Sequence, residues 1–280
     1  MVTVMKSNTS PLHRWPDTRL NAALAVRYPI VQGPFGSGLS RVALAAAVSN
    51  AGGLGSFGVH HLEPDAIVET VADLRRHTSE PFAVNLWVST HDEPEDAMSD
   101  RRWADAVDRL RPLYDELGID APARPARFSP TFDEQVEAVL EARPPVFSWV
   151  FGIPEPGVMD ALRERGIVTV GTAITADEAV ALDEAGVDVI VASGAEAGGH
   201  RAAFLDEPER SLVGTLALVP VVADEVEAPV VAAGGITDAR GIVAALALGA
   251  EGVQLGTAFL ATAQSGASDA HKAALFSPAA

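Results

Sequence analysis

The chain has 280 residues, of which 48% are hydrophobic and 21% are charged, a composition typical of a folded soluble protein and not of a disordered one. Its 38 acidic and 20 basic side chains give a formal net charge of −18, which disfavours nucleic acid and anionic membrane surfaces as partners. The absence of cysteine excludes disulfides, thiolate catalysis, iron–sulfur clusters and cysteine-ligated zinc. The N-terminal segment lacks the apolar stretch of a signal peptide, and the longest uncharged run, residues 42–62, is interrupted by polar residues and glycines. We therefore expect a cytoplasmic protein without a membrane span.

Short apolar runs rich in β-branched residues predict eight strands, and longer segments with helical periodicity separate them. Strands that are apolar at nearly every position suit a parallel sheet with both faces covered. In chain order, the predicted strands are Tyr28–Gln32, Leu54–Phe57, Phe82–Val88, Val146–Phe151, Val168–Gly171, Val187–Ala192, Val230–Ala233 and Gly252–Leu255. The predicted helices are Arg41–Asn50, Glu63–His77, Pro156–Arg165, Ala176–Ala185, Ser211–Val226 and Asp238–Leu248.

Eight strands in strict alternation with helices favour an α/β fold of the (β/α)8 TIM-barrel class, with residues 1–280 forming a single domain. A doubly wound open sheet is the alternative, because periodicity alone does not distinguish the two.

Residues 89–145 break this alternation, since they carry only helical or irregular signals around a proline-rich run. They predict a helical insertion after the third strand, with one helix near Trp103–Leu117 and another near Phe132–Ala142 that leads back to the barrel. Loops that follow barrel strands lie on the catalytic face, so we expect the insertion to cover the active site. An extra scaffold helix is the alternative interpretation.

Glycine-rich segments follow several predicted strands, where the chemistry of a barrel is expected. After strands seven and eight, Gly234–Gly235 and Gly256–Thr257 would let backbone N–H groups approach a phosphate closely. Either segment alone would also fit a tight turn. Together they predict the phosphate site that many barrels share.

His200 is the strongest catalytic candidate. It ends the segment GAEAGGH directly after an apolar strand, where Gly198 and Gly199 leave room for a ligand, and an imidazole titrates near neutral pH. Asn85 is a polar residue in an apolar strand, and its amide suits either a backbone partner or the edge of a planar heterocycle. Glu196 is expected to cap the loop or to hold neighbouring N–H groups. No spaced histidine and carboxylate cluster suggests a metal site.

Five motifs occur together in one order along the chain. They are Ser49–Gly55 (SNAGGLG), Val84–Leu86 (VNL), Gly194–Arg201 (GAEAGGHR), Ala232–Ile236 (AAGGI) and Val253–Leu260 (VQLGTAFL). As an ordered set they resemble the nitronate monooxygenases, a family of FMN-dependent barrels. The resemblance runs from about Tyr28 to the C-terminus and includes FSWVFGIP at Phe147–Pro154.

Carried over by position, the resemblance implies that His200 is the catalytic histidine. The expected FMN-binding residues, which include the two glycine segments derived above, are Gln32, Gly33, Pro34, Phe35, Asn85, Ser193, Gly198, Gly199, Gly234, Gly235, Gln254, Leu255, Gly256 and Thr257. The family commonly has glutamine where Ser193 stands and glycine where Ala202 stands. Typical members also continue for several tens of residues past the segment that matches the end of this chain, so we expect an unusually open pocket.

The reaction that the resemblance implies is oxidation of an alkyl nitronate by FMN and O2 to a carbonyl compound and nitrite. A protonated His200 would hold the anionic nitronate, and a neutral His200 would remove the α-proton of a nitroalkane. Two alternatives stay open: an NAD(P)H-dependent flavin reductase of the enoyl-acyl-carrier-protein reductase type, which shares three of the motifs, and a flavin-binding module without catalysis. Exposed apolar helices would favour a homodimer.

Overall fold

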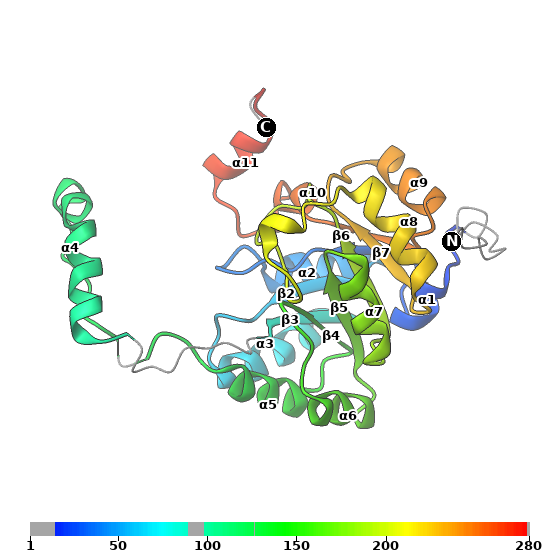
Figure 1. Ribbon diagram of the computed structural model, residues 1–280, viewed down its shortest axis with the longest axis horizontal. Helices are drawn as coiled ribbons and strands as arrows, with labels where there is room; N and C mark the ends of the chain where they lie inside the picture. The colour runs from blue at the N-terminus through cyan, green and yellow to red at the C-terminus, as the bar shows by residue number, and fades with distance from the viewer. Residues whose placement is uncertain (1–14, 89–97, 126, 279–280) are drawn as a thin grey trace.

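Eight short strands pair in parallel around a common axis in the computed structural model, which describes residues 15–88, 98–125 and 127–278 (Figure 1). The order of the strands is β1-β8-β7-β6-β5-β4-β3-β2. They are β1 (Ile30–Gln32), β2 (Gly55–Gly58), β3 (Phe82–Trp87), β4 (Val146–Val150), β5 (Val168–Ala173), β6 (Val189–Ser193), β7 (Val230–Ala233) and β8 (Gly252–Leu255). Each lies within two residues of a predicted strand, so the strand predictions are confirmed.

The sheet closes on itself through β1. Ile30 pairs with Val253 of β8, while a parallel bridge joins Val31 to Leu54, the residue just before β2. A doubly wound sheet would leave both edge strands without such partners. The fold is therefore a (β/α)8 TIM barrel, as predicted.

The helices that follow the strands also match the predictions, mostly within a residue or two. They are α2 (Val42–Asn50), α3 (Pro64–His77), α5 (Phe132–Ala142), α6 (Pro156–Glu164), α7 (Ala176–Glu184), α8 (Thr215–Glu225) and α9 (Ala239–Ala247). Helix α8 begins four residues later than predicted, because the preceding residues form the 3-10 turn Pro208–Arg210 and an extended link to the N-cap Gly214. The short helices α1 (Arg19–Leu24), α10 (Thr257–Leu260) and α11 (Asp269–Leu275) were not predicted.

Helix α1 closes the end of the barrel opposite the strand C-termini. Leu20 and Leu24 are buried and pack with the side chains that fill the barrel interior, including Val31 and Val189. The helix is held by Glu251, whose carboxylate accepts hydrogen bonds from the Arg19 backbone N–H at 2.8 Å and from Arg19 Nε at 2.6 Å. With this end filled, the opposite end is free to carry the site.

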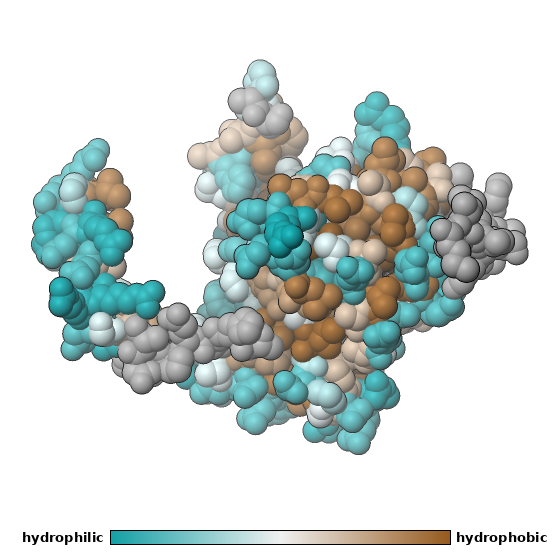
Figure 2. Space-filling model, viewed as in Figure 1, coloured by the Kyte–Doolittle hydropathy of each residue, from teal (hydrophilic) through white to brown (hydrophobic). Residues whose placement is uncertain are grey.

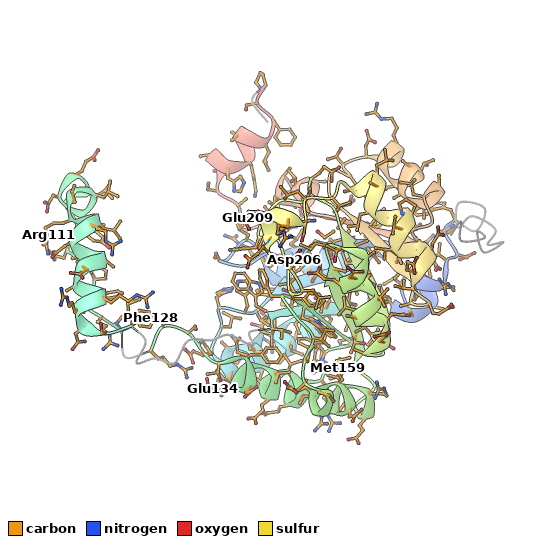
Figure 3. The ribbon with its side chains drawn as sticks, viewed as in Figure 1. Arg111, Phe128, Glu134, Met159, Asp206 and Glu209 are labelled. Carbon is orange, nitrogen blue, oxygen red and sulfur yellow. The ribbon has the colours of Figure 1, made fainter. Side chains whose placement is uncertain are left out.

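Helix α4 (Asp100–Leu117) lies in the predicted insertion and stands away from the barrel (Figure 1). None of its residues is buried, and Arg111 near its middle lies far from the barrel strands (Figure 3). The Trp103 and Phe128 rings, 5.7 Å apart, link the helix to the chain that returns to α5. The predicted helix is thus present. That the whole of residues 89–145 covers the active face stays a prediction, and residues 89–97 and 126 lie outside the described part of the chain.

Apolar side chains gather on the outer face of the barrel that carries α8 and α9 (Figure 2). Leu216 and Val221 of α8 and Val243 of α9 are exposed there. This face is where the predicted homodimer would bury apolar surface, and the dimer stays a prediction.

Candidate active site

A cavity of about 540 Å³ lies at the C-terminal ends of the barrel strands, where barrel enzymes carry their active sites. All of the residues predicted to bind or act on a ligand line this cavity except Gln32 and Leu255. Segments that are far apart in the sequence therefore meet as the ordered motifs predict. The lining residues that were predicted are Gly33, Pro34, Phe35, Asn85, Ser193, Gly198, Gly199, His200, Gly234, Gly235, Gln254, Gly256 and Thr257.

Gln32 and Leu255 stand behind the wall of the cavity. The buried Gln32 amide donates to the Gly33 carbonyl at 2.5 Å, and its Oε1 accepts from the Ser56 N–H at 3.0 Å. The carbonyl of Leu255 accepts from the Gly33 N–H at 2.8 Å. These two residues hold the segment after β1 in place, and their role in binding FMN stays a prediction.

Glycines supply much of the polar wall through their backbone. Gly234 and Gly235 adopt φ angles of +111° and +68°, a region that residues with side chains rarely enter. A Cβ at Gly198 or Gly199 would meet no atom within 4 Å and would project into open space. No lysine or arginine is among the described residues that line the cavity. A bound anion would therefore meet backbone N–H groups and imidazole side chains instead of an ammonium or a guanidinium group.

The loop after β6, which carries His200, is fixed from behind by Arg201. The Arg201 guanidinium donates to the carbonyl of Ser193 at 2.7 Å, to that of Ile174 at 3.3 Å and to that of Ser211. Burial lowers the pKa of Arg201 from its ordinary value, although nearby carboxylates oppose the shift. Three carbonyls from separate segments thus converge on one cation, which sets the path of the loop beside His200.

Two carboxylates complete this support. Glu178 of α7 is 1% exposed and accepts from the N–H groups of Ile174 at 2.8 Å and Phe204 at 2.7 Å. Glu196 accepts from both the N–H and the hydroxyl of Thr215 at 2.8 Å. Burial raises the pKa of Glu196, but these hydrogen bonds and the nearby Arg201 outweigh it, so the pKa lies below the usual value. The prediction that Glu196 holds neighbouring N–H groups is confirmed. The position of Glu178 could not be predicted from helical spacing alone.

His200 faces an aromatic group that sequence reasoning missed. Its ring lies 4.8 Å from the Trp87 ring and 6.1 Å from the Phe151 ring, both in edge-to-face arrangements. Trp87 ends β3, and Phe151 follows β4 with a φ of +72°. A bulky residue in that region is strained, and such strain clusters at functional sites. The one feature of the sequence that could have indicated Trp87 and Phe151 is their position at the C-terminal ends of predicted strands.

His60 also contacts Trp87, stacking on its ring with centroids 4.0 Å apart and planes 10° from parallel. Burial, together with His61 and His200, lowers the pKa of His60 from 6.5 to about 4, so the ring is neutral at neutral pH. Its Nδ1 is buried and has no hydrogen-bond partner within the described part of the chain. Nothing in the residue order singles out His60 from the other histidines.

Asn85 and Ser148 place polar groups on the floor of the cavity. Both line it, and Asn85 Nδ2 donates to Ser148 Oγ at 3.0 Å across the β3–β4 pair. This bond uses one of the two amide donors of Asn85. The remaining amide groups are therefore able to meet a polar ligand edge, as the second of the two predicted roles requires.

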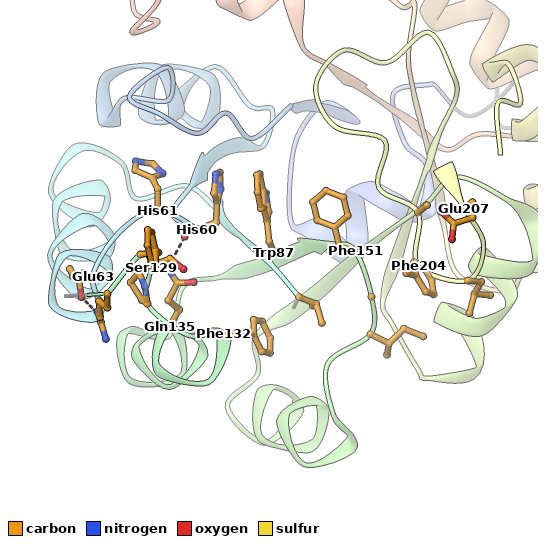
Figure 4. A pocket seen from close by; sticks show the side chains of 18 of the residues that line it. His60, His61, Glu63, Trp87, Ser129, Phe132, Gln135, Phe151, Phe204 and Glu207 are labelled. Atoms are coloured by element: carbon orange, nitrogen blue, oxygen red, sulfur yellow. Dashed lines mark hydrogen bonds and ion pairs between the residues drawn. The ribbon is translucent and has the colours of Figure 1, made fainter. Parts of the chain in front are cut away.

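A larger cavity, here called the vestibule, adjoins the first one and has a volume of about 1070 Å³. His60, Trp87 and Phe151 line both cavities, so these three rings stand at the boundary between them (Figure 4). The outer walls of the vestibule come from the chain before and within α5, such as Phe132, and from the loop after β6, such as Phe204. The returning end of the predicted insertion thus reaches the mouth of the barrel.

In residues 15–88, 98–125 and 127–278, no three histidine or acidic side chains are grouped so that they could hold a metal ion. None of the helices in these ranges combines the length and the apolar character that crossing a bilayer requires.

Comparison with known proteins agrees with this geometry. A protein from Staphylococcus saprophyticus described as a probable nitronate monooxygenase is 41% identical over 262 residues, which cover 92% of this chain and 72% of the relative. A solved structure of nitroalkane oxidase from Streptomyces ansochromogenes is 36% identical, with a TM-score of 0.82, and the match covers 92% of this chain and 73% of that one. FabK from Thermotoga maritima is 32% identical with a TM-score of 0.70, over 92% of this chain and 67% of that one.

The family model described as nitronate monooxygenase matches residues 17–280, which include the barrel, the loop with His200 and both glycine segments. Since this match spans nearly the whole chain, the protein is an oxidoreductase that belongs to the nitronate monooxygenase family.

Proposed function

We propose that this protein oxidises alkyl nitronates with FMN and O2 to a carbonyl compound and nitrite. Membership of a family that is flavin-dependent in general supports the proposal. The observation that carries it is the convergence on one cavity of His200, the aromatic side chains beside it and the glycine segments after β6, β7 and β8.

The residues of the cavity fit FMN. Its volume of about 540 Å³ lies within the range of about 300–1,000 Å³ that is usual for cofactor sites. The backbone N–H groups of Gly234–Gly235 and Gly256–Thr257 would hold the phosphate, since no lysine or arginine of the described lining is available for it. The segment Gly33–Phe35 and the amide of Asn85 would face the ring system.

Bound FMN would supply the electron transfer between nitronate and O2 that no side chain of the protein performs. In the proposed mechanism the imidazole of His200 positions the nitronate: when protonated, it donates a hydrogen bond to the anionic nitro oxygens. When neutral, it accepts the α-proton of a nitroalkane. Trp87 and Phe151 keep water from the side of the imidazole that they cover.

Aerobic turnover tests the proposal. The purified protein, supplemented with FMN, is given 3-methylbutane-1-nitronate and propionate 3-nitronate in separate reactions, and O2 uptake, nitrite and carbonyl product are measured. We expect carbonyl compound and nitrite in equal amounts from one or both nitronates. Absence of nitrite from both nitronates, with FMN bound, would overturn the proposal.

A second candidate is an NAD(P)H-dependent flavin reductase, which is favoured by the 32% identity and TM-score of 0.70 to FabK from Thermotoga maritima. That activity would consume NADH or NADPH in the presence of an enoyl thioester and would form no nitrite. A protein that binds FMN but turns over neither substrate class would instead support a binding module without catalysis.

A further inference from the structure

We propose that the vestibule receives the substituent of the nitronate and selects substituents that are apolar and uncharged. This inference deepens the proposed function and rests on it, because it names the substrate class of the same site. The vestibule is the larger of the two cavities, and the chemistry proposed for His200 gives it no role.

The geometry connects the vestibule to the reacting end of a substrate. His200 lines the inner cavity and lies 4.8 Å, ring to ring, from Trp87, which lines both cavities. A nitronate held at His200 therefore has its substituent beside the boundary rings. The vestibule is the described space on the far side of Trp87 and Phe151.

The walls of the vestibule are suited to an apolar group. Phe132 and Val88 are buried, while Phe151 and Phe204 are half-buried, and all four line the space. His60 adds a ring that is neutral at neutral pH. Burial of a hydrocarbon substituent against such walls contributes about 0.8 kcal/mol for each CH2 group removed from water.

The charged groups at the vestibule are unfavourable for an anionic substituent. Arg127 is the only basic residue among its described lining side chains, apart from the histidines, and it is already paired with Glu63 and with Glu134 at 3.0 Å. Asp206 and Glu207 also line the space, and Asp206 has Arg210 at 3.7 Å as a partner from outside the lining. A substrate carboxylate would meet carboxylates and no unpaired guanidinium.

The inner cavity also provides no lysine or arginine as an ionic partner for a substrate carboxylate, because its described lining contains neither residue. A nitronate that carries a second negative charge would lose the hydration of that charge without gaining an ionic partner. A neutral substituent of the same shape has no such cost. The site therefore discriminates by charge more strongly than by size.

Two nitronates of matched shape test this discrimination. Propionate 3-nitronate carries a carboxylate where 3-methylbutane-1-nitronate carries an isopropyl group. We expect kcat/KM to be at least about tenfold higher for the isopropyl compound, with most of the difference in KM, since the substituent binds away from the reacting atoms. Equal values, or a preference for the carboxylate, would overturn the inference.

Binding without turnover gives an independent readout. Succinate and 4-methylpentanoate are unreactive carboxylate analogues of the two nitronates, and calorimetric titration of the FMN-loaded protein measures their dissociation constants. We expect 4-methylpentanoate to bind more tightly, by a factor of about ten. Tighter binding of succinate would contradict the inference even if turnover were absent.

A positive charge introduced at the edge of the vestibule gives a further test of discrimination by charge. Leu205 lines the vestibule and is 56% exposed, so Leu205→Lys adds a cation without filling the core. We expect the preference for the isopropyl nitronate to narrow at least about threefold. Leu216→Lys is the matched control, because Leu216 is 71% exposed on α8 and lines neither cavity. An equal change in both variants would show that only overall charge matters and would overturn the vestibule assignment.

The two proposals fail in distinguishable ways. If no nitronate yields nitrite, the proposed function fails, and the succinate comparison still decides whether the vestibule discriminates by charge. If both nitronates are oxidised but the carboxylate is preferred, the proposed function stands and the inference about the vestibule fails.

Discussion

The loop after β6 and the inserted helix α4 differ in what holds them in place. The loop is fixed by polar side chains, with the half-buried Arg201 donating to three carbonyls and the buried Glu178 accepting from backbone N–H groups. Helix α4 has no buried residue; its Ser99 and Gly118 caps are supplemented by the exposed Arg111–Asp108 ion pair and by contacts with Arg124 and Phe128 of the returning chain. The segment that carries His200 is therefore anchored by hydrogen bonds to a buried carboxylate, whereas α4 is not. Substitutions of the same kind in the two regions should have very different effects.

The largest contrast is expected in catalysis. His200→Asn removes the imidazole, and turnover of the nitronate should fall about 10²–10⁴-fold while FMN stays bound. Arg111→Gln on α4 removes an exposed side chain that pairs with its helix neighbour Asp108 and lines neither cavity, and turnover should not change. Steady-state kinetics and the flavin absorbance of each purified variant measure both effects. Undiminished turnover in His200→Asn would remove His200 from the mechanism.

The second contrast uses two glycines with left-handed backbone. A Cβ at Gly234 (φ +111°) would lie 2.7 Å from Thr215 Oγ1 and 2.9 Å from the Ala197 N atom, so Gly234→Ala should lower the free energy of unfolding by about 2–4 kcal/mol. Gly118 (φ +63°) has open space around it at the end of α4. Gly118→Ala should fray that helix yet leave the unfolding free energy of the barrel within about 0.5 kcal/mol. Denaturant unfolding followed by circular dichroism checks both values.

Two glutamates of α7 give a smaller contrast within one helix. Glu178→Gln weakens the charge-assisted bonds to Ile174 and Phe204, and we expect a loss of about 2 kcal/mol in unfolding free energy. Glu184 is exposed on the same helix, so Glu184→Gln should change this value by less than about 0.5 kcal/mol. Similar losses in both variants would argue against Glu178 as the residue that anchors the loop.

The smallest effect concerns pH. Burial, His61 and His200 lower the pKa of His60 to about 4 in the folded chain, whereas the unfolded chain protonates this ring below about pH 6.5. The stability contributed by the neutral ring is therefore present above pH 6.5 and is lost as the pH falls towards 4. Because the ring is only half-buried, we expect a loss on the order of 1 kcal/mol. His60→Phe should reduce the difference in unfolding free energy between pH 7 and about pH 4.5, whereas His271→Phe at an exposed position should not.

The barrel and the inner cavity followed from the sequence because their signals are local. Apolar β-branched runs fix the strands, and Gly234–Gly235 and Gly256–Thr257 follow strands whose C-termini must meet in a barrel. Trp87 was missed because an aromatic residue in a predicted strand is as consistent with the hydrophobic core as with a ligand site. The φ of Phe151 depends on the turn after β4 and has no signature in residue order.

The vestibule could not be predicted for a different reason. Its walls come from segments that only the folded chain brings together: residues near His60, the ends of β3 and β4 with the residues that follow them, the chain before and within α5, and residues 203–207. Glu178 likewise occupies a position that looks like an exposed helix surface, and it is buried because the loop after β6 folds back over it. Long-range packing of this kind leaves no periodic pattern in the sequence.

Anaerobic reduction of the flavin by a nitronate tests the central claim most directly. The FMN-loaded protein is mixed without oxygen with 3-methylbutane-1-nitronate, and separately with NADH, while the flavin absorbance is recorded. The account predicts that the nitronate reduces the flavin and that NADH does not. Reduction of the flavin by NADH but not by the nitronate would contradict the account and would indicate an NAD(P)H-dependent flavin reductase.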